Sequence, residues 1–304
     1  MQSEFVPGPP PQRPLFGAAV MAVAMVFLPL MDAAAKYMSG TIPAIELVWA
    51  RFFFHALLLT PIMLARYRPR ELWPQRPLLQ IARALTIVVA TTFFFRGLAT
   101  TPLADMLAVF FINPFIITAL APWVLGDRIG RWRWTATVIG FIGALVIIRP
   151  GFAELTPGVL YAIGAGLCYS FYALSTRKLA GSDSPLVTLF FTGLVGCVAA
   201  SCLLPWIWVW PTPQQWVLMS SMGLVSAVGH ACVIIASERA PAPLLAPLAY
   251  LEIVSATLLG YFIFGDLPAR TTWIGMAIIV ASGLVIVWRE KVRGVERGDA
   301  GPAV

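Results

Sequence analysis

The chain has few charged residues. Only 12% of its 304 residues are Asp, Glu, Lys or Arg, whereas 59% are hydrophobic. Soluble domains usually carry about 25% charged residues, so this composition excludes an ordinary soluble protein and indicates a polytopic membrane protein. The net charge of +7 does not indicate a nucleic-acid partner, because the basic residues occupy short gaps between apolar stretches and report topology there.

Metal-ligating and catalytic patterns are also scarce. The sequence contains two histidines and four cysteines. The cysteines stand inside apolar stretches without a CxxC or Cys/His spacing, so we interpret them as small packing residues. There is no Walker loop, HExxH motif or nucleophile motif, and no gap is long enough for a soluble catalytic domain. The sequence therefore predicts no enzyme, no cofactor and no metal site.

Long apolar stretches dominate the chain instead. A helix needs roughly 20 residues to cross a hydrocarbon core of about 30 Å. Ten stretches meet this requirement approximately, so we expect an all-α membrane protein with ten transmembrane helices. The expected spans are 15–37, 44–65, 78–98, 103–125, 132–148, 157–178, 185–208, 215–237, 243–264 and 272–288.

Basic residues are distributed unevenly between the two sides of these spans. With a cytoplasmic N-terminus, fifteen Lys and Arg residues fall on the cytoplasmic side and three on the outer side. This bias predicts that both termini are cytoplasmic, with a disordered tail over 1–14 and a second tail over 291–304. The apolar run from Leu15 to Met31 is long for a signal peptide and only Arg13 precedes it as a base, so we expect a retained first helix.

The two halves of the sequence repeat one another. Residues 111–140 align with residues 250–279 without a gap, which places the GDR motif at 126–128 over the GDL motif at 265–267. Each half contains five predicted spans, and an odd number forces the second copy to cross the membrane in the opposite direction. Inverted repeats of this kind are a transporter architecture, with the binding site near the midplane between the halves.

We therefore expect two inverted five-helix repeats around a central cavity, over residues 15–150 and 151–290. Two such repeats, each ending in a helix pair joined by GDR or GDL with a Trp soon after, resemble the EamA-type carriers of the drug/metabolite transporter superfamily. The early stretch DAAAKYMSG…ELVWARFFF fits the same family. The usual linker of the family reads Gly-Glu where this chain has Gly-Asp, and the likeness covers nearly all of residues 15–290.

The resemblance implies both an architecture and a function. Helices one, three, four, six, eight and nine are expected around the cavity, with helices five and ten at the periphery. The members that this chain resembles most are bacterial amino-acid exporters. The implied function is secondary transport without ATP, by alternating access, that exports neutral and aromatic amino acids.

Other functions stay open at this point. The alternatives are export or import of another small solute, such as a vitamin, nucleoside or lipophilic cation, or a channel. A channel would need a dedicated filter or charged rings, and the sequence contains neither. The expected partners are a small-molecule substrate and the lipid bilayer of a bacterial-type inner membrane, without nucleic acid, and we expect the chain to work as a monomer.

Two polar residues stand at matching places in the repeats. Glu252 and Asn113 are 139 residues apart and each lies about eight residues into its span, so they reach similar depth from opposite faces. Pro114, Pro243 and Pro247 beside them free backbone carbonyls, which inside a membrane only protein, water or ligand can satisfy. We expect both to line the substrate cavity. The alternative is that Asn113 bonds a neighbouring helix and that Glu252 pairs with a buried base.

The remaining substrate-binding candidates are aromatic or histidine side chains: Tyr169, Tyr172, Tyr250, His230 and Phe95. Tyrosine rings and hydroxyls suit an amphipathic solute, with packing as the alternative. A lone membrane histidine is usually a hydrogen bonder between helices. We interpret Arg51 as a structural anchor and expect Arg83 to reach the cytoplasmic interface by snorkelling.

Four charged residues are candidates for an outer charge network or gate: Asp32, Lys36, Arg96 and Asp105. Asp32 and Lys36 are four residues apart on one predicted helix and can pair with each other. Arg96 and Asp105 flank the tight turn between the third and fourth spans, where they form either an outer gate or a simple ion pair.

Overall fold

The structure of the protein is a computed structural model that describes residues 13–126, 130–148, 156–179 and 181–299. Within these ranges the chain forms helices and no β-strand. The first half contains α1 (Pro14–Met38), α2 (Ala44–Arg66), α3 (Pro77–Leu98), α4 (Leu103–Phe110), α5 (Asn113–Leu125) and α6 (Arg131–Ile148). The second half contains α7 (Pro157–Lys178), α8 (Pro185–Ser201), η1 (Leu204–Trp206), α9 (Pro213–Arg239), α10 (Ala242–Leu245), η2 (Ala246–Tyr250), α11 (Leu251–Phe264) and α12 (Arg270–Asp299).

Most of these helices have membrane-crossing length. Among the described residues, eight segments are long and apolar enough to cross a membrane, and two further apolar helices, Trp134–Ile148 and Arg270–Val285, are shorter. The exact count of ten spans therefore stays a prediction. The tail predicted over 1–14 lies almost entirely outside the described residues, and α12 continues into the tail predicted over 291–304.

Two of the predicted spans are interrupted near their middle. The span over 103–125 is divided into α4 and α5, and the span over 243–264 is divided into α10, the 3-10 helix η2 and α11. Proline explains both breaks, because it lacks an N–H donor and its ring clashes with the preceding turn. Pro114 is the second residue of α5, and Pro247 lies inside η2. Asn113 thus begins α5, and Glu252 occupies the first turn of α11.

The two interrupted spans also end alike. Gly126 terminates α5 with φ of 73°, and Gly265 terminates α11 with φ of 71°. Both angles lie in the left-handed region, which glycine enters without the steric penalty of a Cβ atom. These are the glycines of the GDR and GDL motifs. The residues that follow Gly126, at 127–129, lie outside the described part of the chain.

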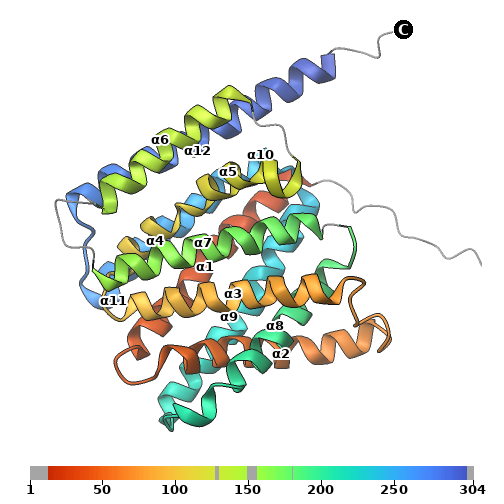
Figure 1. Ribbon diagram of the computed structural model, residues 1–304, viewed down its shortest axis with the longest axis vertical. Helices are drawn as coiled ribbons and strands as arrows, with labels where there is room; N and C mark the ends of the chain where they lie inside the picture. The colour runs from red at the N-terminus through yellow and green to blue at the C-terminus, as the bar shows by residue number, and fades with distance from the viewer. Residues whose placement is uncertain (1–12, 127–129, 149–155, 180, 300–304) are drawn as a thin grey trace, which may run out of the picture.

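Helices from the two halves interleave. The helix α1 packs against α9 and α11, α3 packs against α7 and α8, and α2 packs against α8 and α9. The helices α6 and α12 lie side by side along one edge of the molecule (Figure 1). Gly143 and Gly275 face each other there so closely that a methyl group on either would crowd the other's carbonyl oxygen. Small residues that let backbones approach are typical of helix pairs in membranes.

Arg83 is buried on α3, with only 2% of its surface exposed. The prediction that it snorkels to the interface is therefore wrong. Its guanidinium contacts five residues, which together with Arg83 form the Arg83 cluster. The contacts are Gln80 Oε1 (3.1 Å), Thr176 Oγ1 (3.0 Å), the Thr188 carbonyl (3.1 Å), the Thr192 hydroxyl and the Tyr172 ring, whose centroid is 4.9 Å away. Neutral oxygens of α3, α7 and α8 thus satisfy this cation inside the protein.

Candidate functional site

A cavity of about 320 Å³ lies between the two halves of the chain. Small-molecule sites typically occupy about 300–1,000 Å³, so the volume suits a small solute. The wall is built from α1, α3, α4, α5, α7, α9, η2 and α11, with one residue from α2. These elements include every helix that the family resemblance places around a cavity. Among the described residues, none of those that line the cavity belongs to the predicted peripheral pair, α6 and α12.

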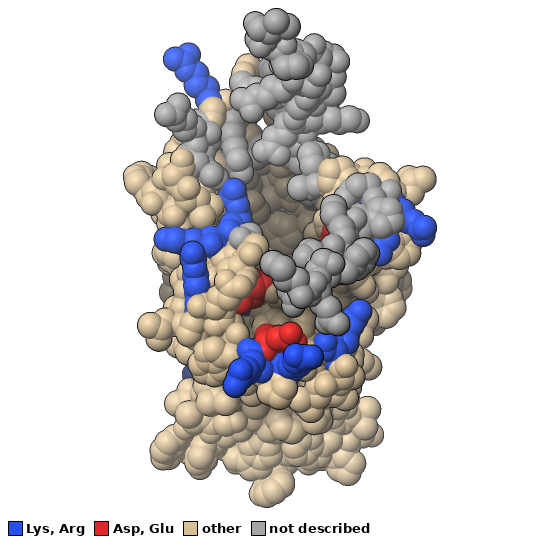
Figure 2. Space-filling view, turned by 90° about the vertical axis from the view of Figure 1, so that its right-hand side faces the viewer, with Lys and Arg blue, Asp and Glu red and all other residues tan. Residues whose placement is uncertain are grey.

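One end of the molecule is hollowed and basic. Figure 2 looks at the side on which α1 begins, and Lys and Arg side chains gather around a hollow there. The cavity wall extends toward this side, because it includes Met21 in the first part of α1 and Val233 near the end of α9.

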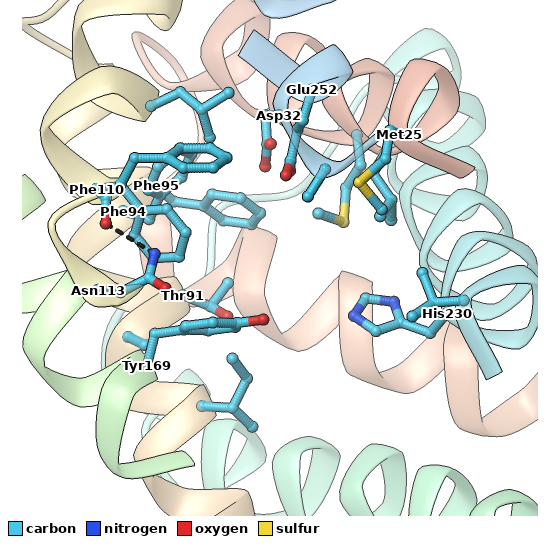
Figure 3. Close-up of a pocket in the computed structure, with 18 of the residues that line it drawn as sticks. Met25, Asp32, Thr91, Phe94, Phe95, Phe110, Asn113, Tyr169, His230 and Glu252 are labelled. Atoms are coloured by element: carbon cyan, nitrogen blue, oxygen red, sulfur yellow. Dashed lines mark hydrogen bonds between the residues drawn. The ribbon is translucent and has the colours of Figure 1, made fainter. Parts of the chain in front are cut away.

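Two carboxylates share the cavity. Asp32 of α1 is 7% exposed, and Glu252 projects from the first turn of α11. Figure 3 shows both carboxyl groups side by side and directed into the same space, and the two groups interact electrostatically. Neither forms an ion pair with a described residue. Glu252 therefore lines the cavity as predicted, and the alternative that it pairs with a buried base is not found among the described residues.

Asp32 corrects one sequence-based prediction. It does not pair with Lys36, although the two are four residues apart on α1. Lys36 Nζ instead donates to Asp266 Oδ2 at 2.5 Å and to the carbonyl oxygen of Thr101 at 3.3 Å. Because Asp266 offers Lys36 a partner from the other half of the chain, Asp32 is left to face the cavity. We call Lys36, Thr101 and Asp266 the Lys36 latch, since their hydrogen bonds connect α1 to the turns before α4 and α12.

The other two gate candidates lie apart from the central cavity. Arg96 is exposed at the end of α3. Asp105 lines a second cavity of about 270 Å³, formed near the turn between α3 and α4. A gating role for either residue stays a prediction.

Arg51 is the functional candidate that sequence reasoning missed. It lies on α2, is 8% exposed, and lines the central cavity. Its Nη1 donates to Thr91 Oγ1 at 2.8 Å and its Nε to Ser226 Oγ at 3.4 Å. The hydroxyl of Ser226 also lies 3.2 Å from His55 Nδ1. The signal in the sequence was a base and a histidine four residues apart on one predicted helix, but nothing local showed which cavity they would meet.

Aromatic and sulfur-containing side chains form much of the remaining wall. Phe110 packs edge-to-face against Phe94 (centroids 5.4 Å apart) and Tyr169 (5.1 Å). Phe95 and three methionines of α1 complete this apolar surface. Phe95 and Tyr169 thus line the cavity as expected. Aromatic rings and flexible methionines adapt to flat or irregular ligands.

Two of the predicted tyrosines stand behind the wall. Tyr172 packs against Tyr169 at 5.6 Å and beneath the Arg83 guanidinium, and Tyr250 packs against Phe111 at 5.8 Å. Neither belongs to the lining of the central cavity. Although Tyr172 is only three positions after Tyr169 on α7, its ring contacts Tyr169 and the Arg83 guanidinium instead of the cavity.

Asn113 and His230 both reach the cavity (Figure 3). Asn113 is 7% exposed, and its Nδ2 donates to the carbonyl oxygen of Phe110 at 2.9 Å, which satisfies a group freed by the break between α4 and α5. His230 Nδ1 lies 2.8 Å from the Ser226 carbonyl oxygen, and its ring centroid is 6.4 Å from that of His55. His230 thereby bonds within its own helix, α9, and not across helices.

Comparison with known proteins connects this arrangement to a family. The sequence matches the EamA-like transporter family twice, over residues 15–149 and 156–288. The S-adenosylmethionine uptake transporter of Rickettsia prowazekii is 27% identical over 277 residues, which cover 91% of this chain and 94% of that protein. The riboflavin transporter of Rhizobium johnstonii is 27% identical over 288 residues (93% and 94%). The pseudopaline exporter CntI of Pseudomonas aeruginosa is 26% identical over 283 residues (90% and 97%).

These matches confirm the resemblance to EamA-type carriers. The family and the relatives are named for transport of small molecules, and none of the three names describes an enzyme. Because the two family matches cover nearly all of the chain, it belongs to the EamA-like transporter family, as a multi-pass membrane transporter of small metabolites.

Proposed function

We propose that the protein is a secondary transporter for a small amphipathic metabolite that carries at least one positive charge, with S-adenosylmethionine as the first candidate. The observation that carries this proposal is the pair of carboxyl groups, Asp32 and Glu252, which lie side by side without an ion-pair partner among the described residues in a cavity walled by aromatic rings and methionines. Two carboxyl groups at short range do not readily ionise together in an empty apolar site, and a cation placed between them stabilises their ionised forms.

The apolar wall defines the rest of the solute. Phe94, Phe110 and Tyr169 offer ring faces and edges on the side of the cavity opposite His230 (Figure 3). Such rings attract planar heterocycles by stacking and cations by their quadrupole. S-adenosylmethionine combines a planar adenine with an ammonium and a sulfonium group. The relatives from Rickettsia, named for uptake of this molecule, add support.

Export of neutral and aromatic amino acids is the second candidate. The aromatic wall favours it, and one ammonium group would meet the carboxylate pair. A neutral amino acid leaves one negative charge of the pair without a partner, so we expect a bound proton to accompany or exchange with such a substrate. The relatives are named for both uptake and export, and export from the cytoplasm remains our prediction from the sequence resemblance.

We further propose the inverted-repeat topology, with repeats over 15–150 and 151–290 and both termini in the cytoplasm of a cell with a bacterial-type inner membrane. Separate family matches to the two halves support the repeats. The start of α1 and the end of α12 point toward one side of the molecule (Figure 1), which supports the shared location of the termini. A periplasmic signal from a reporter fused to the C-terminus would contradict it. We propose that the transporting unit is a monomer.

A flux assay tests the function. The purified protein is reconstituted into liposomes and supplied with radiolabelled S-adenosylmethionine, phenylalanine or riboflavin, with and without a pH gradient, from either side. We expect saturable, counterflow-competent transport of S-adenosylmethionine. Transport of phenylalanine alone would select the second candidate, and raised tolerance of overexpressing cells to toxic amino-acid analogues would support export. Transport of riboflavin alone, or fast flux without counterflow, would overturn the proposal.

A further inference from the structure

Arg51 has hydrogen-bonding capacity that the protein does not use. Its Nε and Nη1 have hydroxyl acceptors on Ser226 and Thr91, but in the described part of the chain no group accepts a hydrogen bond from Nη2. No described carboxylate forms an ion pair with Arg51 either. Arg51 lines the central cavity, and its Nη2 is not fully enclosed by protein. A buried guanidinium with an N–H group that has no acceptor is unfavourable, and a ligand acceptor would complete it.

The arginine is also held in place. Thr91 of α3 and Ser226 of α9 accept hydrogen bonds from the guanidinium, and the ring of Phe52 lies 5.2 Å from its central carbon. His55 in turn contacts the hydroxyl of Ser226, which helps to hold this hydroxyl in position beside Arg51. A planar guanidinium that is fixed in this way presents its free N–H groups in one orientation. Such a fork binds carboxylates more selectively than a flexible lysine does.

The cavity has two poles of opposite charge. Asp32 and Glu252 form the negative pole, on α1 and α11, and Arg51 on α2 forms the positive one. Asp32 and Arg51 interact electrostatically but do not reach ion-pair distance, so the guanidinium is not simply the counter-ion of this carboxylate. A solute with an ammonium group near a carboxylate matches both poles at once.

We propose that Arg51 binds the carboxylate of the substrate, so that the site selects solutes with an amino-acid moiety over the corresponding amines. Thr91 and Ser226 act as positioning residues for the guanidinium. This assignment rests on the proposed function, because it needs the cation of the same solute to occupy the carboxylate pair.

Two pairs of probes isolate the carboxylate. Phenylalanine differs from phenethylamine, and S-adenosylmethionine from its decarboxylated form, only by that group. The affinity of each probe for the purified protein in detergent follows from the concentration dependence of its effect on the melting temperature. We expect the wild type to prefer the acid of each pair by at least about tenfold, since hydrogen bonds between charged groups are the strong ones.

In Arg51→Gln the preference should fall to near one, because binding of the acid weakens while binding of the amine is retained. Arg51→Lys keeps the charge without the planar fork and should give an intermediate ratio of acid to amine affinity. This variant also tests the proposal if Arg51→Gln does not fold. Arg66→Gln, at an exposed base in the last turn of the same helix, is the control and should leave the ratio unchanged. Equal weakening of acid and amine in both Arg51 variants, or a wild type without preference, would overturn the proposal. A wild type that binds none of the four probes would contradict the proposed function instead.

Discussion

Arg83 and Arg51 are both buried among the described residues, but they differ in how many of their guanidinium nitrogens have a hydrogen-bond acceptor. At Arg83 all three guanidinium nitrogens donate hydrogen bonds, to oxygens of α3, α7 and α8, and the Tyr172 ring covers the group. At Arg51 only Nε and Nη1 have acceptors among the described residues, and the side chain borders a cavity. Arg83 therefore needs no ligand to complete its hydrogen bonds, whereas Arg51 has a guanidinium nitrogen left for one.

The difference separates a structural cation from one that is available for binding. Both arginines stand in apolar spans, so neither composition nor position along the chain distinguishes them. What matters is the supply of acceptors from neighbouring helices. Threonines of α7 and α8 meet Arg83, and they hold α3 against the second half of the chain. Near Arg51 the described residues of neighbouring helices provide two hydroxyl acceptors, on Thr91 and Ser226. The side chain borders the cavity where a third acceptor would lie.

The Arg83 cluster should show the largest effect on stability. Replacement Arg83→Leu removes the donor from several buried oxygens at once, and each unsatisfied buried group costs about 1–3 kcal/mol. We expect a loss of about 3 kcal/mol or more in the free energy of unfolding, measured as a lowered melting temperature in detergent. Substrate preference in the remaining folded protein should be retained. Arg96→Leu, at an exposed site, is the matched control, and an equal effect of both variants would show that the cluster is not a structural centre.

The acidic pole should show the largest effect on transport. We expect Glu252→Gln to insert and fold normally but to lower kcat/KM for amine-bearing substrates by at least about tenfold, which corresponds to about 1.4 kcal/mol. The defect should be smaller for a solute without a positive charge. Flux in proteoliposomes and melting in detergent are measured on the same preparation. Unchanged flux with a sharply lowered melting temperature would make Glu252 a structural residue.

The Lys36 latch should show the smallest effect. The side chains of Lys36 and Asp266 are 14% and 32% exposed, so solvent screens their attraction, and pairs of this kind contribute about 0.2–1 kcal/mol. We expect Lys36→Met and Asp266→Asn each to change the apparent affinity for substrate on the outer side by only a few fold. The double variant should be no worse than either single one. Fully additive effects in this double-mutant cycle would show that the ion pair is not the coupling contact.

Much of the site followed from repeat symmetry and local chemistry. Asn113 and Glu252 were placed in the cavity because they occupy matching positions beside prolines, and the structure puts both in its wall. Tyr172 and Tyr250 do not line the cavity in this structure, and the sequence did not show this, because a tyrosine in an apolar helix looks the same whether its ring faces a cavity or a neighbouring helix. The position of a side chain around the helix axis depends on contacts with elements far away in the chain.

The all-helical class, the family and the breaks in two spans could be predicted without a structure, because hydropathy, motif spacing and proline chemistry are local properties of the chain. The partners of the charged residues, by contrast, could be identified only after the helices were packed together. Lys36 forms an ion pair with Asp266, so Asp32 lies beside Glu252 in the cavity. All three guanidinium nitrogens of Arg83 donate hydrogen bonds, whereas Nη2 of Arg51 has no acceptor among the described residues. Each of these outcomes depends on which helix of one half packs against which helix of the other. A charge inside a membrane is stabilised only by groups that packing brings within hydrogen-bond distance.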